Sequence, residues 1–71
     1  MKNKFELKGE YIELIKFLKA IGLAETGGHA QQIVMENLVQ LNGKLETRKR
    51  AKIRNGDVIA VFGEEYEIIS Q

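Results

Sequence analysis

The spacing of apolar residues changes twice within the first forty positions of the chain. Apolar and charged residues alternate over residues 4–8, where charged side chains flank Phe5 and Leu7. This alternation predicts a short strand with one buried face. From Glu10 the spacing becomes three or four residues, which predicts a helix that ends at Gly22, a residue suited to the left-handed position after a helix. The apolar face of this helix is predicted to contain Tyr11, Leu14, Ile15, Leu18 and Ile21.

A second helix is predicted from Thr26 to about Glu36. The Thr26 hydroxyl can accept a hydrogen bond from the free amides of the first turn, and Asn37 is a plausible left-handed terminator. A hairpin should follow, because Val39 and Leu41 alternate and are expected to point inward, and Leu45 is expected to continue their apolar face. The positions expected at positive φ are Gly22, Asn37 and the turn residues Asn42 and Gly43.

The last third of the chain is predicted to contain only turns and strands. Residues 54–57 indicate a turn, residues 58–62 a buried strand, and Gly63-Glu64 a tight turn into a final strand over residues 66–69. The order of strand, two helices and about four short strands is typical of the α+β class. Without proline, repeats or a low-complexity linker, residues 1–71 are expected to form a single domain.

Composition narrows the possible chemistry. Cysteine is absent and histidine occurs once, so neither a disulfide framework nor a zinc site is expected, and no cofactor is implied. The apolar runs are too short to span a bilayer, and residues 1–10 lack the apolar segment of a secretory signal. We therefore expect a soluble cytoplasmic protein that does not bind membranes.

Positive charge is concentrated in residues 42–57, although the net charge of the whole chain is only +1. This segment carries six Lys or Arg side chains against two carboxylates, a net charge of +4, whereas residues 58–71 carry three Glu and no Lys or Arg. Such local patches matter more for anionic partners than the total charge does. The six cationic residues are Lys44, Arg48, Lys49, Arg50, Lys52 and Arg54.

An extended conformation of residues 48–54 would make this segment suited to a nucleic-acid backbone. Alternation would direct Ala51 and Ile53 inward and leave four cations on one face, about 7 Å apart: Arg48, Arg50, Lys52 and Arg54. That spacing is close to the repeat of phosphates along a strand, and Arg binds phosphate in a bidentate manner. The alternative is a solvated charged loop with no partner.

The start of the second helix offers another candidate contact. Gly27 and Gly28 lower helix stability, and two explanations are open: bare amides admit an RNA phosphate to the positive helix end, or glycine eases a tight corner. His29 and Gln31 would lie at the rim of such a site, within reach of phosphate or ribose.

Residues 10–61 resemble the ribosomal protein S-four type RNA-binding domain, known as the αL motif. The positions that match its pattern are Leu14, Leu18, Gly22, Leu23, Thr26, Ala30, Val39, Leu41, Asn42, Gly43, Leu45, Ile53, Gly56, Asp57 and Ile59. The short length and the basic stretch from Glu46 to Arg50 are similar to the stand-alone bacterial YbcJ-like members. The resemblance implies two helices packed on a small, mostly antiparallel sheet, and binding of structured RNA. The family usually places Arg after the small hydroxyl residue, where this chain has Gly27.

The sequence therefore predicts a non-catalytic protein that binds structured RNA, such as ribosomal or transfer RNA, through backbone phosphates. No nucleotide-binding loop or nucleophile–base pair is visible, so an enzyme with a small-molecule substrate is not expected. An adaptor that docks an acidic protein through the basic segment is the alternative, and a monomer is expected. The predicted RNA contacts are Thr26, Gly27, Gly28, His29, Gln31, Lys44, Arg48, Lys49, Arg50, Lys52 and Arg54.

Overall fold

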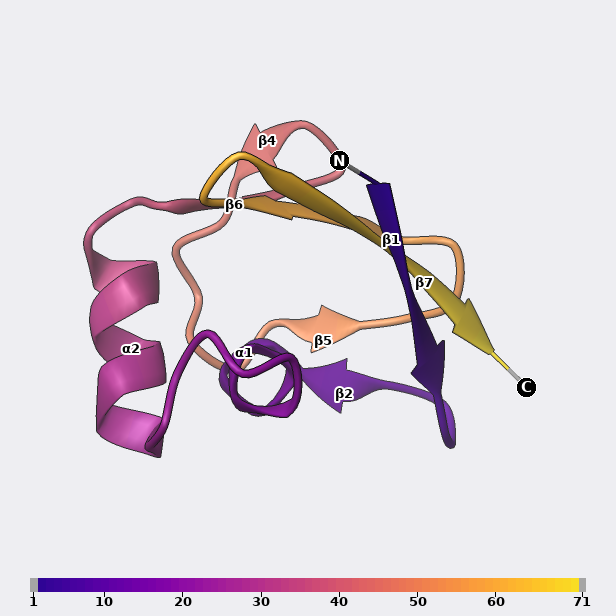
Figure 1. Cartoon of the computed structure of the whole chain (residues 1–71), viewed down its shortest axis with the longest axis horizontal. Helices are drawn as coiled ribbons and strands as arrows, with labels where there is room; N and C mark the ends of the chain where they lie inside the picture. The colour runs from indigo at the N-terminus through magenta and orange to yellow at the C-terminus, as the bar shows by residue number, and fades with distance from the viewer. Residues whose placement is uncertain (1, 71) are drawn as a thin grey trace.

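The computed structural model of the chain describes residues 2–70 (Figure 1). It confirms the α+β class, with two helices and short strands that form a mostly antiparallel sheet. In chain order the elements are β1 (Lys2–Leu7), β2 (Ile12–Glu13), α1 (Leu14–Ala20), α2 (Gly27–Met35), β3 (Val39–Leu41), β4 (Lys44–Leu45), β5 (Lys52–Ile53), β6 (Val58–Val61) and β7 (Glu64–Ser70).

The strands form two separate sheets. The larger has the order β1-β7-β6-β3-β4, in which β1 lies parallel to β7 and the other neighbours are antiparallel. The smaller is an antiparallel ribbon of β2 and β5. Both helices and this ribbon lie on the same side of the larger sheet, and none of the helices and strands described in residues 2–70 covers its other face (Figure 1).

The core lies between the helices and the larger sheet. Phe17 of α1 is completely buried, and its ring makes edge-to-face contacts with Phe5 at 5.0 Å and Tyr66 at 5.6 Å between ring centroids. Such aromatic pairs add to the free energy gained from burying their area. The other buried apolar side chains are Leu7, Leu14, Leu18, Ala24, Ala30, Ile33, Val34, Val39, Ala51, Ile53, Ile59, Val61 and Ile68.

The predicted helix ends and hairpin turn are confirmed. The amides of Gly22 and Leu23 donate to the carbonyls of Lys19 and Leu18, which is the Schellman pattern, with Gly22 at φ 83°. Asn37 ends α2 at φ 61°. The turn between β3 and β4 has φ 52° and 83° at Asn42 and Gly43, as a type I′ turn requires.

The start of the first helix was predicted too early. α1 begins at Leu14, because Ile12 and Glu13 pair with Ile53 and Lys52 as strand β2 instead of continuing the helix. Helical spacing assigned Tyr11 to the buried face, but its side chain is 42% exposed.

Two details of the hairpins were also wrong. Leu45 is 53% exposed, because the register places it opposite Gln40 and so on the outer face of the sheet, not beside Val39. The turn between β6 and β7 consists of Phe62 and Gly63, one residue earlier than predicted, and the Phe62 side chain is 54% exposed.

The type I′ turn predicts the effect of a substitution at Gly43. No atom would obstruct a side chain there, so Gly43→Val acts only through the backbone, where a β-branched residue is strained at φ 83°. We expect the free energy of unfolding to fall by more than about 1 kcal/mol. Urea titration of both proteins measures this, and Gln40→Val on the neighbouring strand is the control. Equal stability of Gly43→Val and wild type would contradict the turn assignment.

Candidate nucleic-acid interface

The basic segment is anchored by its buried residues and its backbone. Ala51 and Ile53 are buried as predicted, and the Ile53 side chain has no exposed area. The amides of Leu14 and Ile15 donate to the carbonyls of Ala51 and Lys49, at 2.9 and 3.2 Å. The first turn of α1 thereby uses two of its free amides to hold the basic segment in place.

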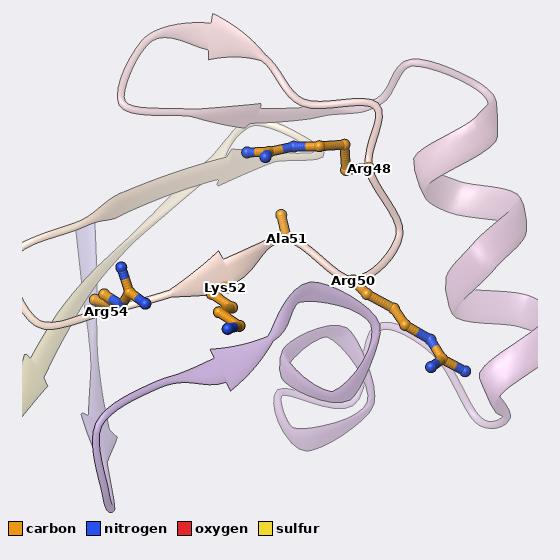
Figure 2. Close-up of a pocket in the computed structure, with 5 residues that line it drawn as sticks. All are labelled: Arg48, Arg50, Ala51, Lys52 and Arg54. Carbon is orange, nitrogen blue, oxygen red and sulfur yellow. The ribbon is translucent and has the colours of Figure 1, made fainter.

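Four cations of this segment line one shallow, open hollow of about 440 Å³ (Figure 2). The residues that line it are Arg48, Arg50, Ala51, Lys52 and Arg54. Four cationic residues gathered at one hollow create a local field that attracts anions such as phosphate.

The predicted straight row of cations is not present. The amide of Ala51 donates to the carbonyl of Arg48 at 3.2 Å, so residues 48–51 form a turn, and the segment is extended only beyond it. The 7 Å strand spacing therefore applies to Lys52 and Arg54 but not to the first two arginines. Arg50 points away from the other three, to the side on which α2 lies (Figure 2).

Arg48 is held by a carboxylate that the sequence analysis counted only as opposing charge. Glu46 is 7% exposed, and its Oε2 accepts from the Arg48 amide at 2.9 Å and from Arg48 Nε at 3.1 Å. A third bond, from Arg48 Nη2 to Glu46 Oε1, spans 3.3 Å. The hydrogen bond from the Arg48 side chain lowers the pKa of Glu46 below its ordinary value. Glu46 thus orients Arg48 and neutralises part of its charge.

Asp57 holds the other end of the segment. Its Oδ2 accepts from the Arg54 amide at 2.7 Å, and its Oδ1 accepts from Asn42 Nδ2 at 3.0 Å. Asn42 Oδ1 in turn accepts from the Val58 amide at 2.9 Å. These bonds connect the β3–β4 turn to the turn that follows β5, and they fix the backbone from which the Arg54 side chain projects.

Tyr11 is a residue that the sequence analysis missed at this surface. Lys52 Nζ lies 5.0 Å from the centre of the Tyr11 ring, a cation–π contact, and the ring is partly exposed. An exposed aromatic ring beside a cationic hollow can stack on a nucleic-acid base. The helical spacing of the following apolar residues places Tyr11 on a buried face, so no pattern in the sequence indicated its exposure.

The start of α2 confirms the predicted cap and shows a second partner. Thr26 Oγ1 accepts from the His29 amide at 3.0 Å, and His29 Nδ1 accepts from the Glu25 amide at 3.4 Å. His29 therefore takes part in the cap with one ring nitrogen and has the other for an external contact. Gln31 is half-buried on the same helix.

The two glycines of this helix are not required by the fold. Neither Gly27 nor Gly28 has positive φ, and a Cβ at Gly27 would have no atom within 4 Å. A Cβ at Gly28 would meet only Thr26 Oγ1, at an ordinary 3.8 Å. The tight-corner explanation needs an obstacle or an unusual backbone, and the structure has neither at these positions.

Two predicted contacts lie outside the hollow. Lys44 is exposed on β4, at an edge of the larger sheet, and Lys49 is exposed in the turn but does not line the hollow. Within residues 2–70, no group of three or more His, Asp or Glu side chains is placed to hold a metal ion. No helix in that range is long and apolar enough to cross a membrane.

Comparison with known families assigns the chain to a class of domain. The sequence profile of the S4 domain matches residues 5–69, nearly the whole chain. The protein belongs to the S4 domain family.

Known relatives agree with this assignment. YbcJ of Escherichia coli K12, named as a candidate RNA-binding protein, is 33% identical over 63 residues, which cover 89% of this chain and 90% of YbcJ. RlbA of Bacillus subtilis, named as a candidate ribosome maturation protein, is 32% identical over 63 residues and 89% of each chain. The solution structure of E. coli YbcJ, described as containing an αL motif involved in RNA binding, superimposes with a TM-score of 0.70 at 34% identity, covering 93% of this chain and 85% of YbcJ.

The contact between Glu46 and Arg48 predicts a pH-dependent contribution to stability. Because the pKa of Glu46 is lowered on folding, its contribution is present above its ordinary value of 4.5 and is lost as the pH falls through the lower folded value. Glu46→Gln should lower the melting temperature at pH 7 by on the order of a few degrees. The difference in melting temperature between wild type and Glu46→Gln should be smaller at pH 3. The control is Glu10→Gln, because the Glu10 side chain is exposed. A difference that does not vary with pH would contradict the ion pair.

Proposed function

We propose that this S4 domain protein binds structured RNA without catalysing a reaction, through contacts to backbone phosphates. The observation that carries the proposal is the hollow lined by Arg48, Arg50, Lys52 and Arg54. Guanidinium groups suit phosphate because they donate two parallel hydrogen bonds to its oxygens. The names of YbcJ and RlbA, and the described motif of YbcJ, support RNA as the partner.

The proposed interface extends from the hollow to the N-terminus of α2. The amides at the start of α2 are not covered by side chains at Gly27 and Gly28, so a phosphate could approach the positive end of the helix dipole. Thr26, His29 and Gln31 would flank that phosphate, and Lys44 and Lys49 would add positive charge outside the hollow.

The RNA class is proposed to be ribosomal or transfer RNA. The ribosome maturation role in the name of RlbA supports ribosomal RNA. We further propose that the protein acts in the cytoplasm as a monomer, with residues 1–71 as one domain. Sequencing RNA crosslinked to the tagged protein in cells distinguishes the two RNA classes.

Salt dependence tests the phosphate contacts. Each neutralised phosphate changes the slope of log K against log salt by about −0.7 to −0.9, so four contacts predict a slope near −3. Among residues 2–70, the Arg50 and Arg54 side chains have no carboxylate partner that would offset their charge, whereas the Arg48 side chain is bonded to Glu46. Changing Arg50 and Arg54 to Gln should flatten the slope by about 1.5 on two stem-loop RNAs of unrelated sequence, because backbone contacts do not read bases.

The control for this titration has the same charge change at a different place. Lys8 and Lys19 are exposed and do not line the hollow, so their double change to Gln should alter the slope less. Melting curves should show that both double variants fold. An unchanged slope for the Arg50 and Arg54 variant would make the basic segment a solvated loop, and the adaptor that docks an acidic protein would become the better explanation.

The two glycines of α2 give an independent test with two readouts. Changing Gly27 and Gly28 to Ala should stabilise the free protein by about 1 kcal/mol, because Ala favours helix and no atom obstructs its Cβ. The same change should weaken RNA binding, because the added methyl groups cover the amides. Gln32→Ala on the same helix is the control. Unchanged affinity would remove the helix end from the interface, and lower stability would favour the tight-corner explanation.

A further inference from the structure

Tyr11 is an exposed aromatic residue beside the cationic hollow, and the phosphate contacts proposed above give its ring no role. Within residues 2–70 the exposed large apolar side chains are Tyr11, Met35, Leu38, Leu45 and Phe62. Tyr11 contacts a residue that lines the hollow, since Lys52 Nζ lies 5.0 Å from the centre of its ring. A flat apolar surface is therefore held next to a group of phosphate-binding side chains.

The register of the β2–β5 ribbon places Tyr11 close to two cations. Ile12 pairs with Ile53, and Ile53 has no exposed area, so this rung is directed into the core. The next rung, one step beyond the last paired residues, sets Tyr11 opposite Arg54 and diagonally across from Lys52. Alternation directs these three side chains to the outer face of the ribbon, and all three are exposed. Figure 2 shows both cations on the segment that runs beside β2.

The spacing of Lys52 and Arg54 suits two consecutive phosphates of one strand. Residues two apart on an extended strand are about 7 Å apart, which is close to the repeat of phosphates along a nucleic-acid strand. The base of a nucleotide held in this way projects from the sugar between those two phosphates, within reach of the Tyr11 ring. Glu13 lies opposite Lys52, and its carboxylate is 3.8 Å from Lys16 Nζ. This carboxylate limits the phosphate path to the Tyr11 end of the ribbon.

A base can replace the Lys52 ammonium on the Tyr11 ring. A cation–π contact at an exposed site is weaker than the stacking of a nucleic-acid base on an aromatic ring, so this exchange is favourable. The released ammonium then becomes available to a phosphate of the same nucleotide. Before RNA binds, the contact with Lys52 holds the ring in position, which reduces the entropy that the ring loses on binding.

A base inside an RNA duplex is unable to make this contact. Both of its faces are covered by neighbouring base pairs, so a protein meets mainly the backbone and the edges of the bases. The bases of bulges, loops and single-stranded ends have free faces that stack on aromatic side chains. Every base has such a face, so stacking does not distinguish the four bases from one another.

We propose that Tyr11 stacks on an unpaired base, and that the interface thereby selects structured RNAs with an unpaired nucleotide beside the backbone bound at the hollow. Lys52 and Arg54 hold the phosphates on either side of this nucleotide, and Tyr11 holds its base. The inference rests on the proposed RNA-binding function and adds to it the kind of RNA that is preferred. The preference is for an unpaired base of any identity, not for a sequence.

The test compares two RNA duplexes that have the same charge. Both contain the same paired strands and one bulged nucleotide, which carries the fluorescent base 2-aminopurine in one duplex and no base in the other. Anisotropy of a dye at one duplex end measures both Kd values. Wild type should bind the 2-aminopurine duplex about tenfold more tightly, because only that duplex has a free base to stack. Binding should also change the 2-aminopurine fluorescence, which responds to stacking.

Three variants assign the preference to the ring. Tyr11→Leu keeps an apolar side chain but removes the ring, so it should abolish both the preference and the fluorescence change. Tyr11→Phe keeps the ring and should retain both. Phe62→Leu removes an exposed ring from the β6–β7 turn and is the matched control, which should behave as wild type. Melting curves should show that all three variants fold, and the salt slope should not differ among them, because no charge changes.

The outcomes separate this inference from the proposed function. Equal affinity of wild type for the two duplexes, with a steep salt slope, would overturn stacking and leave the phosphate contacts in place. An unchanged preference in Tyr11→Leu, or its loss in Tyr11→Phe, would also overturn it, because the ring face would not be the recognised feature. Failure of wild type to bind either duplex with a salt-dependent affinity would refute the proposed RNA binding itself, and this inference with it.

Discussion

The pairing of β2 with β5 at the start of α1 is the constraint on which the candidate interface depends. A segment with five cations in seven residues repels itself, so a fixed conformation requires strong local attachment. Buried Ala51 and Ile53 supply apolar contacts on one side of the segment, and the amides of Leu14 and Ile15 bond its backbone. The same pairing shortens α1, exposes Tyr11 and places its ring below Lys52. The cationic hollow and its aromatic neighbour therefore have one structural origin.

Features set by local chemistry could be predicted from the sequence, and features set by distant pairing could not. The residues Gly22, Asn37, Asn42 and Gly43 have positive φ. Because few residue types tolerate that conformation, residue identity alone was enough to predict it. The start of α1 depends on a partner strand about forty residues away, and the exposure of Leu45 depends on hairpin register. Arg48 was predicted to belong to a row of unpaired cations, but its side chain is bonded to Glu46. Only the burial of Glu46 distinguishes it from other carboxylates, and burial cannot be read from the sequence.

Side-chain pairing makes the four arginine and lysine residues of the hollow unequal. Arg48 gains a fixed orientation from Glu46 but has part of its charge neutralised, whereas Arg50 and Arg54 keep their full charge and more conformational freedom. A preoriented guanidinium loses less entropy on binding, and a free one gains more electrostatic energy. The hollow combines both kinds, so its affinity for an anion is not proportional to its formal charge.

The distribution of charge separates the molecule into surfaces that suit different partners. Four of the six cations of residues 42–57 line a hollow on the helical side of the larger sheet, and the carboxylates of residues 58–71 lie on β7. The net charge of +1 conceals this separation, because the two groups nearly cancel. A small total charge with a concentrated basic segment attracts an anion locally, at the hollow, without attracting it strongly to the whole surface.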